Sequence, residues 1–368
     1  MKNITLIAGA RPNFMKIAPI IHAIQKAQND GHPLQYRLVH TGQHYDNEMS
    51  GSFFSQLEIP EPHINLGAGG GSQAEQTAAI MIGFEQELIK NPADVVLVVG
   101  DVTSTMACAI VAQKLNTKVA HVEAGIRSND WSMPEEINRL VTDAITNYFF
   151  TTTELANEIL RKSGVSDDKL FLVGNTMIDT LLKNRPRFQQ PDIWNRIGLE
   201  NKKYIVITLH RPANVDEEGQ LEAMLNEIIA HSNDLPLVFP VHPRTAKIID
   251  ALGISHPRLH LMEPMGYLEF NYLVQHSKAV ITDSGGITEE TTVLGIPCIT
   301  LRDNTERPET ITEGTNELIG THPKNIQPAL EKLFADKWKK GNIPKYWDGA
   351  TAERIVQQLC LIKTEQMP

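Results

Sequence analysis

The stretch 279–309 contains the densest group of residues that could do chemistry. Its apolar start, 279–282, predicts a buried parallel strand, and the Asp-Ser-Gly-Gly sequence at 283–286 predicts a tight turn before a helix over 287–294. Backbone N–H groups point outward where a strand turns into a helix, and the helix dipole favours an anion there. Glycine lets a phosphate approach the backbone closely. Glu290 lies about one helical turn further on, within reach of a ribose hydroxyl pair.

This pattern is typical of a cradle for a nucleoside diphosphate, but it also fits an ordinary strand–turn–helix whose glycines serve only the turn. The formal net charge is −10, so a diphosphate site must draw its positive charge from nearby side chains. Arg11 and Lys16 meet this need because they flank the start of a predicted helix over 13–28, directly after a predicted strand over 4–8. Ligands bind at that edge of an open α/β sheet.

Acidic side chains and a histidine stand where other predicted strands end or a predicted helix begins. They are Asp101, Glu123, Glu135, Glu136 and His210. Asp101 also fits a simple helix cap, and two glutamates in a first helical turn also suit the helix dipole. His210 also fits a residue that closes its strand against a neighbouring loop. These residues could act in acid–base chemistry, because carboxylates and histidine are the usual proton donors and acceptors of enzymes.

Strands and helices alternate along the whole chain. Strands are predicted over 4–8, 34–39, 95–99, 119–122, 148–151 and 170–173, and then over 204–209, 237–240, 259–262, 279–282, 298–301 and 318–319. This alternation predicts an α/β protein with doubly wound parallel sheets, and 368 residues are comfortable for two domains. We expect an N-terminal domain over 1–173, with a C-terminal helix within 350–368 packing back on it, and a second domain over 174–349.

Composition excludes several classes of protein. An apolar content of 41% and a charged content of 21% describe a globular chain, and no basic patch indicates a nucleic-acid partner. Cys108, Cys298 and Cys360 lie far apart without a CxxC pair, so we expect neither a metal site nor a disulfide. No segment predicts a signal peptide or a membrane span, so we expect a cytoplasmic protein with no membrane partner.

Nine motifs occur in order along the chain. They are GARPNFMK at 9–16, GDVTST at 100–105, HVEAGIRS at 121–128, MPEEINR at 133–139, GNTMID at 174–179, TLHR at 208–211, PVHPR at 240–244, DSGGITEE at 283–290 and RDNTERPE at 302–309. Together they resemble the non-hydrolysing UDP-N-acetylglucosamine 2-epimerases over roughly residues 4–320. The resemblance implies a glycosyltransferase-B-like fold, with two Rossmann-like domains facing across a cleft, and a homodimer. It also implies interconversion of UDP-GlcNAc and UDP-ManNAc for surface polysaccharide synthesis.

The resemblance further implies roles for individual residues. It gives acid–base roles to Asp101, Glu123, Glu135 and His210. It gives substrate binding to Arg11, Lys16, His242, Ser284, Gly285, Gly286, Glu290 and Arg307. Gln43, Glu136 and Arg211 match positions that hold a second, activating UDP-GlcNAc in many members. Two departures put that activation in question, because Tyr45-Asp46 follow Gln43-His44 where an arginine is usual, and the loop 67–71 lacks an arginine.

The chemistry of the implied reaction fits elimination. C2 of an N-acetylhexosamine lies beside no carbonyl that would acidify it, and no GxGxxG motif indicates a nicotinamide cofactor that could create one. We therefore expect no cofactor: a base takes the C2 proton while the C1–O bond to UDP breaks, and UDP then re-adds after the proton returns to the other face. Asp101, Glu123 and Glu135 are equal candidates for the base.

Three other functions fit parts of the pattern. The first is a 2-epimerase acting on UDP-2,3-diacetamido-glucuronic acid, whose sequences share similar GARPNFMK and GQHYD stretches and whose substrate needs an extra cation for its carboxylate. The second is a sugar transferase on the same fold, for which the carboxylates at 101, 123 and 135 would be surplus. The third is a UDP-sugar sensor, which would be expected to lose those carboxylates while keeping the DSGG turn.

Overall fold

The computed structural model describes residues 1–42, 56–217, 219–241 and 243–362, and of Arg11 and Pro12 it describes only the backbone. Gln43 and His242 therefore lie outside the described residues. The chain forms two compact units, one made of Met1–Lys183 with the segment from Lys345 onward, the other of Asn184–Pro344. We call them unit 1 and unit 2 and describe each by itself.

Unit 1 is built on a seven-stranded sheet in which all neighbouring strands are parallel. The strand order is β3-β2-β1-β4-β5-β6-β7. The strands are β1 (Lys2–Ala8), β2 (Leu34–His40), β3 (Ile64–Asn65), β4 (Val95–Val99), β5 (Lys118–Val122), β6 (Tyr148–Thr151) and β7 (Leu170–Leu172). The helices of this unit are α1 (Arg11–Asn29), α3 (Gln73–Lys90), α4 (Thr103–Lys114), α5 (Pro134–Ala144), α6 (Glu154–Lys162), α7 (Thr176–Asn184) and α16 (Thr351–Leu361), with a 3-10 turn η1 (Asp167–Lys169).

Unit 2 repeats this architecture with six parallel strands in the order β10-β9-β8-β11-β12-β13. The strands are β8 (Ile205–Thr208), β9 (Leu237–Pro240), β10 (Leu259–Met262), β11 (Ala279–Thr282), β12 (Cys298–Thr300) and β13 (Asn316–Leu318). The helices are α8 (Ile193–Arg196), α9 (Pro212–Val215), α10 (Gln220–His231), α11 (Pro243–Ala251), α12 (Tyr267–His276), α13 (Gly285–Leu294), α14 (Glu309–Thr312) and α15 (Ile326–Phe334), with 3-10 turns η2 (Arg185–Arg187) and η3 (Pro323–Asn325).

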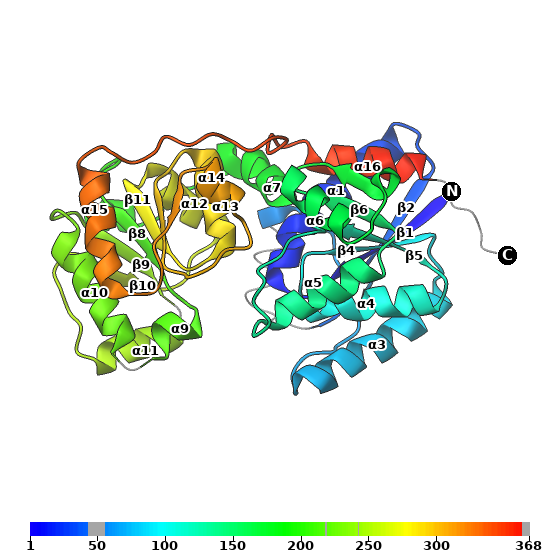
Figure 1. Ribbon diagram of the computed structural model, residues 1–368, viewed down its shortest axis with the longest axis horizontal. Helices are drawn as coiled ribbons and strands as arrows, with labels where there is room; N and C mark the ends of the chain where they lie inside the picture. The colour runs from blue at the N-terminus through cyan, green and yellow to red at the C-terminus, as the bar shows by residue number, and fades with distance from the viewer. Residues whose placement is uncertain (43–55, 218, 242, 363–368) are drawn as a thin grey trace. The chain divides into compact units, whose positions relative to one another are not determined.

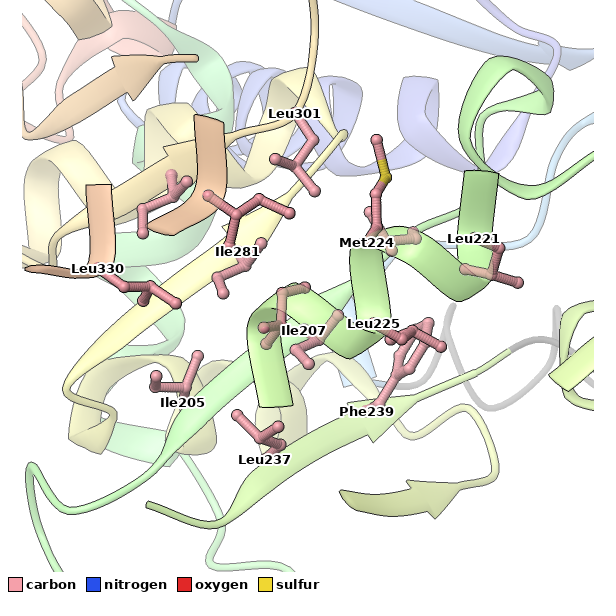
Figure 2. Close-up of a cluster of buried hydrophobic side chains, with 14 of the residues drawn as sticks. Ile205, Ile207, Leu221, Met224, Leu225, Leu237, Phe239, Ile281, Leu301 and Leu330 are labelled. Carbon is pink, nitrogen blue, oxygen red and sulfur yellow. The ribbon is translucent and has the colours of Figure 1, made fainter. Parts of the chain in front are cut away.

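Helices cover both faces of each sheet, as Figure 1 shows for α10 and α12 in unit 2. Successive residues of a strand point to opposite faces, so β8 divides its side chains between two cores. Ile205 and Ile207 pack with residues of α10 and α15 in the cluster of Figure 2, whereas Val206 packs in a second cluster with residues of α12. All three side chains are completely buried. Strands buried on both faces explain the continuous apolar runs in the sequence.

The C-terminal helix α16 belongs to unit 1 and packs against α1, beside which it lies in Figure 1. Asp179 of α7 anchors its start, because the Asp179 carboxylate accepts hydrogen bonds from the backbone N–H groups of Thr351 (3.1 Å) and Ala352 (2.7 Å). These N–H groups belong to the first turn of a helix and have no partner within it. The GNTMID motif therefore has a structural role in holding the last helix of the chain.

Both sheets have a topological switch point, where the strand order reverses. In unit 1 it lies between β1 and β4, and in unit 2 between β8 and β11, since chain order runs outward in both directions from these pairs. Ligands of open α/β sheets bind outside the carboxyl ends of the strands at such a point. The loops after these strands contain Asp101, His210 and Asp283-Ser284, and the helices that follow β1 and β11 begin at Arg11 and Gly285. The topology thus places these sequence-predicted residues at the switch point of each unit.

Two local expectations were wrong. The predicted turn 283–286 ends earlier than expected, because α13 begins at Gly285 with Ser284 as its N-cap residue. Gly285 and Gly286 therefore form the first turn of the helix. The capping role considered for Asp101 is also wrong, because the N-cap residue of α4 is Val102.

Candidate functional site

A buried ion pair joins two of the predicted site residues in unit 1. Lys16 lies on α1, and Glu123 follows β5; their Nζ and Oε2 atoms are 2.8 Å apart. The side chain of Glu123 is 3% exposed and that of Lys16 is 13% exposed. A carboxylate this deeply buried requires a charged or hydrogen-bonding partner, because its desolvation costs several kcal/mol, on the order given for buried ions. Lys16 supplies that partner at the carboxyl edge of the sheet.

The backbone around this pair takes unusual conformations. Glu123 has a φ of 70°, in the left-handed region that non-glycine residues rarely adopt. Gly100, at the end of β4, has a φ of 69°, and a Cβ atom built on it would lie 3.3 Å from Lys16 Nζ and 3.9 Å from Glu123 Oε2. Gly100 therefore leaves the space in which the ion pair forms. Strained residues such as Glu123 cluster at functional sites, where the surrounding structure holds them in place.

Asn13 fixes the loop between β1 and α1. Its side-chain oxygen accepts hydrogen bonds from the backbone N–H groups of Gly9 (3.2 Å) and Ala10 (3.1 Å), and its amide nitrogen donates to the carbonyl of Val99 (3.0 Å). Asn13 is buried. It therefore joins the ends of β1 and β4 across the switch point, and it fixes the backbone at the position of Arg11. Sequence analysis did not single it out, although the residue lies inside the GARPNFMK motif.

Asp101 makes an ion pair with an arginine that sequence analysis missed. Arg139 of α5 donates to the Asp101 carboxylate from Nε (3.1 Å) and Nη2 (2.5 Å), and from Nη1 to Glu136 (2.7 Å). Asn138 donates to the Asp101 carbonyl at 2.8 Å. The first turns of α5 thereby hold both the backbone and the side chain of Asp101. The MPEEINR motif contains all the residues that make these contacts.

Glu136 is buried, and its carboxylate is hydrogen-bonded to neighbouring residues of unit 1. Its carboxylate accepts hydrogen bonds from the backbone N–H and hydroxyl of Ser128 and from the backbone N–H of Asn129. Burial tends to raise the pKa of Glu136, but the hydrogen bonds from Ser128, Arg139 and Asn129 outweigh it and lower the pKa. Glu136 thus ties the loop after β5 to α5. Its predicted contact with an activator stays a prediction.

A second buried network supports the loop that carries Glu123. His121 of β5 contacts Asp143 through Nδ1 (2.7 Å) and the carbonyl of Gly100 through Nε2 (2.9 Å). Asp143 also accepts from Arg127 (2.6 Å) and from the backbone N–H of Gly125 (3.1 Å). Burial tends to raise the pKa of Asp143, but His121 and Arg127 outweigh it and lower the pKa. The network fixes the backbone on both sides of Glu123.

Glu135 completes the predicted carboxylates of unit 1. It lies in the first turn of α5, next to Glu136, and its side chain is half-buried. Arg11 is the first residue of α1, directly after the loop that Asn13 holds. Unit 1 therefore brings together Lys16, Glu123 and the Gly100-Asp101 loop. Glu135 lies on α5, the helix whose Asn138 and Arg139 contact Asp101.

In unit 2, His210 and Arg211 are gathered around Asp283. The loop after β8 contains both residues, and Asp283 directly follows β11. The Asp283 carboxylate lies 2.7 Å from His210 Nδ1 and accepts hydrogen bonds from the backbone N–H groups of His210 (3.0 Å) and Arg211 (2.9 Å). The side chain of Asp283 is completely buried, whereas that of His210 is 60% exposed. His210 is thus anchored on one side and open to solvent on the other.

The start of α13 is the place where the sequence predicts an anion cradle. Ser284 has an extended backbone (φ −87°, ψ 128°), and its side chain makes no capping hydrogen bond to the helix. A Cβ atom built on Gly285 would lie 3.7 Å from Arg302 Nη1, which is ordinary contact. Arg302 in turn makes a two-pronged pair with Glu306, with both distances at 2.9 Å. The glycine surface at the helix start therefore faces a charged pair from the RDNTERPE motif.

Glu290 lies deeper in α13 than the cradle and is buried. It accepts a hydrogen bond from the hydroxyl of Tyr267 at 2.9 Å. Burial, with a smaller contribution from the charge of Glu289, raises the pKa of Glu290 to about 7, even though Tyr267 opposes the shift. Arg307, which is predicted to bind substrate, makes an ion pair with Glu289. Sequence analysis missed both Glu289 and Tyr267.

Within the described residues, no helix is long and apolar enough to cross a membrane. No group of three or more metal-ligating side chains occurs in that part of the chain.

The comparisons with known proteins agree with this geometry. A family model described as UDP-N-acetylglucosamine 2-epimerase matches residues 25–360. A UDP-N-acetylglucosamine 2-epimerase from Methanocaldococcus jannaschii is 40% identical over 369 residues, which cover 97% of this chain and 98% of the relative. A UDP-2,3-diacetamido-2,3-dideoxy-D-glucuronate 2-epimerase from Pseudomonas aeruginosa is also 40% identical, over 98% of this chain and 99% of the relative.

A solved structure of the Methanocaldococcus jannaschii UDP-GlcNAc 2-epimerase, in complex with UDP-GlcNAc and UDP, matches with a TM-score of 0.85. It is 39% identical, and the match covers 98% of this chain and 99% of that one. The chain therefore belongs to the UDP-N-acetylglucosamine 2-epimerase family. The predicted family and the predicted fold of two Rossmann-like α/β domains are both confirmed.

Proposed function

We propose that this protein is a non-hydrolysing 2-epimerase that interconverts UDP-GlcNAc and UDP-ManNAc. The observation that carries the proposal is Glu123, a buried carboxylate with a strained backbone that is paired with Lys16 at the carboxyl edge of the sheet. In this proposal the Glu123 carboxylate contacts the substrate, and it belongs to a chain that matches a relative named UDP-N-acetylglucosamine 2-epimerase over 97% of its length.

In this proposal unit 1 supplies the groups that act at C2 of the sugar. Asp101, Glu123 and Glu135 are the candidate acids and bases, and the chain holds each in a different way. Asp101 faces Arg139, Glu123 faces Lys16, and Glu135 stands in the first turn of α5. Arg11, beside the same switch point, would bind the sugar or its diphosphate.

Unit 2 would bind UDP. The N–H groups of Gly285 and Gly286 lie in the first turn of the helix that begins after Ser284, where the helix dipole favours the diphosphate. Glu290 would accept hydrogen bonds from the ribose hydroxyls, and Arg307 would bind substrate from the motif that follows α13. His242 is also proposed to contact UDP. His210 would face the bridge between sugar and diphosphate and stabilise the departing UDP.

The proposed reaction is an elimination followed by a re-addition. A base removes the proton from C2, the C1–C2 double bond forms, and the C1–O bond breaks with its electron pair going to UDP. The intermediates are 2-acetamidoglucal and UDP. A proton then returns to the opposite face of C2, and the UDP oxygen adds to C1 again. No oxidant or reductant enters this sequence, so we propose that the protein needs no cofactor.

A second candidate substrate is UDP-2,3-diacetamido-2,3-dideoxy-D-glucuronate. The relative that acts on UDP-2,3-diacetamido-2,3-dideoxy-D-glucuronate is as similar to this chain as the UDP-GlcNAc 2-epimerase from Methanocaldococcus jannaschii, at 40% identity in both cases. Both substrates share UDP and the acetamido group at C2, so the elimination would be the same. They differ at C3 and C6, where the diacetamido sugar carries a second acetamido group and a carboxylate.

We further propose a cytoplasmic homodimer that supplies surface polysaccharide synthesis, as the family resemblance implies. Gln43, Glu136 and Arg211 are the proposed contacts of an activating UDP-GlcNAc. If such a site operates, adding UDP-GlcNAc will accelerate the conversion of UDP-ManNAc.

The experiment that tests the proposed function compares the two sugars with the same enzyme preparation. Purified protein is incubated separately with UDP-GlcNAc and with the UDP-diacetamido-glucuronic acid, and the products are separated by anion exchange and identified by proton NMR. We expect UDP-ManNAc. Glu123→Gln protein is the inactive control, used after circular dichroism has shown that it is folded. Turnover of the diacetamido sugar alone would move the assignment to the second substrate. Release of free ManNAc would indicate a hydrolysing enzyme.

A further inference from the structure

Asp283 is a buried carboxylate to which sequence analysis gave no role beyond the turn. Four donors surround its two oxygens. The backbone N–H groups of His210 and Arg211 lie at 3.0 Å and 2.9 Å, the Asn214 amide nitrogen at 3.1 Å, and His210 Nδ1 at 2.7 Å. Burial tends to raise the pKa of Asp283, but His210, Arg211 and Asn214 outweigh it and lower the pKa. Asp283 is therefore an ionised acceptor for every group around it.

The position of His210 Nδ1 against this carboxylate fixes where the ring proton lies. An ionised carboxylate can only accept hydrogen bonds, so the imidazole nitrogen that faces it must carry a hydrogen. The other nitrogen, Nε2, is then the ring atom that can take up or release a proton. Because the His210 side chain is 60% exposed while its Nδ1 contact is buried, Nε2 is the nitrogen left on the open side of the ring.

The same residue connects His210 to the proposed diphosphate cradle. The Asp283 carbonyl accepts a hydrogen bond from Arg211 Nε at 3.1 Å, and the next residue along the chain is Ser284, the N-cap of α13. Asn214 extends the connection, since its amide nitrogen also donates to the carbonyl of Leu301 at 3.1 Å. A shift of Asp283 would therefore move His210 and the start of α13 together.

We propose that Asp283 is the positioning residue of His210: it holds the ring in the Nδ1–H tautomer and turns Nε2 towards the ligand that binds at the start of α13. Its catalytic consequence rests on the proposed function. In the elimination, Nε2 in its protonated form donates a hydrogen bond, or its proton, to the UDP oxygen that leaves C1, and the same atom takes the proton back when UDP re-adds. Asp283 keeps its own charge throughout and touches no reacting atom.

The tautomer is measured first, on the unaltered protein. Nitrogen-15 NMR of histidine-labelled protein distinguishes a ring nitrogen that carries hydrogen from one that does not, and the signals that vanish in His210→Asn protein belong to His210. At a pH where the ring is neutral, we expect Nδ1 of His210 to carry the hydrogen and Nε2 to be bare. The opposite tautomer, or a mixture as in a free imidazole, would overturn the proposal. This readout does not depend on any activity of the protein.

Kinetics then tests whether Asp283 acts through His210. We expect Asp283→Asn to lower kcat by about 10- to 100-fold, the scale seen when the hydrogen-bonding partner that orients a metal-bound histidine is lost. In the His210→Asn background the same substitution should lower kcat by less than about 3-fold, because residues that act as one unit do not add. Full additivity of the two losses would contradict a role through the ring.

Asn214→Ala is the matched control. It removes another donor from the same carboxylate and leaves the contact with His210 Nδ1 in place. We expect it to lower the melting temperature while kcat per folded molecule and the His210 tautomer stay unchanged. If Asn214→Ala reproduces the kcat loss of Asp283→Asn with the tautomer intact, the carboxylate only anchors the loop and the proposal fails. If instead the protein epimerises no sugar while the tautomer is as expected, the proposed function fails and the tautomer assignment stands.

Discussion

Replacing Lys16 by methionine tests whether the Lys16–Glu123 pair is as desolvated as its geometry indicates. The substitution keeps much of the side-chain volume but leaves the Glu123 carboxylate, 3% exposed, without the ammonium group that lies 2.8 Å away. Breaking a buried ion pair by removing one partner costs about 3–5 kcal/mol. We expect about 3 kcal/mol, the lower end, because the Lys16 side chain is 13% exposed and water can reach part of the vacated space.

Urea denaturation followed by circular dichroism measures this loss, with Lys26→Met as the matched control. Lys26 lies on the same helix and makes an ion pair with Glu353 at 2.7 Å, but the two side chains are 66% and 53% exposed. An exposed pair contributes little to stability, so the control should leave the denaturation midpoint nearly unchanged. Adding Glu123→Gln to Lys16→Met should recover part of the loss, since a neutral amide is easier to bury than a charge. If Lys16→Met is as mild as Lys26→Met, the pair is not desolvated and the reasoning is refuted.

Four further predictions concern turnover and UDP binding. Gly285→Val should weaken UDP binding at least 10-fold in isothermal titration with little change in melting temperature, because its Cβ meets only ordinary contacts in the protein; unchanged affinity would remove the cradle. Asp101→Asn and Glu135→Gln should each lower kcat about 100-fold, the scale of a lost acid or base; a variant with normal kcat would be reassigned as structural. His210→Asn should lower kcat about 10- to 1000-fold, the scale of one lost electrostatic donor, with KM nearly unchanged. A variant with a lower melting temperature and full activity would instead show that His210 has a structural role. The Glu290 carboxyl, with its pKa raised to about 7, should bind ribose better when ionised. UDP affinity should therefore rise more steeply from pH 6 to pH 8 in the natural protein than in Glu290→Gln, where only the UDP phosphate titrates; a parallel pH dependence in both would contradict the assignment.

The raised pKa of Glu290 also predicts a dependence of stability on pH. A carboxyl whose pKa is higher in the folded state stabilises the fold only while it is protonated. Its contribution is complete below about pH 4.5, the unfolded value, and is lost as the pH rises through about 7. Relative to Glu290→Gln protein, the natural protein should therefore lose stability between pH 5 and pH 8. Melting curves of both proteins over this range give the difference directly.

The sequence was informative about strands because buried parallel strands are continuous apolar runs. The predicted strand 95–99 is β4 and the predicted strand 279–282 is β11, with the same ends. The start of α13 was misplaced because glycine is a poor helix former, so two glycines indicated a turn. Two glycines destabilise a helix little when they lie in its first turn. Ser284, in an extended conformation, is the N-cap residue directly before them. Helix α11 was not anticipated either, since its amphipathic pattern is short.

Partners of the site residues could not be predicted from local pattern. Asp283 and His210 are 73 residues apart in the chain, and Arg139 is 38 residues from Asp101. Asn13 reaches the end of β4 across 86 residues. Strand order brings these groups together, and one sequence does not state which strands are neighbours. The motifs did contain all of these residues, but their individual roles depend on contacts that only the folded chain makes.

The exchange of hydrogen at C2 tests the central claim most directly. UDP-GlcNAc is incubated with the purified protein in deuterium oxide, and proton NMR follows the C2 signal of substrate and product. Removal of the C2 proton by a protein base predicts that UDP-ManNAc forms with deuterium at C2 and that the remaining UDP-GlcNAc also loses its C2 proton signal as the reaction reverses. Formation of UDP-ManNAc that keeps its original C2 proton would contradict the elimination and the roles given to Asp101, Glu123 and Glu135.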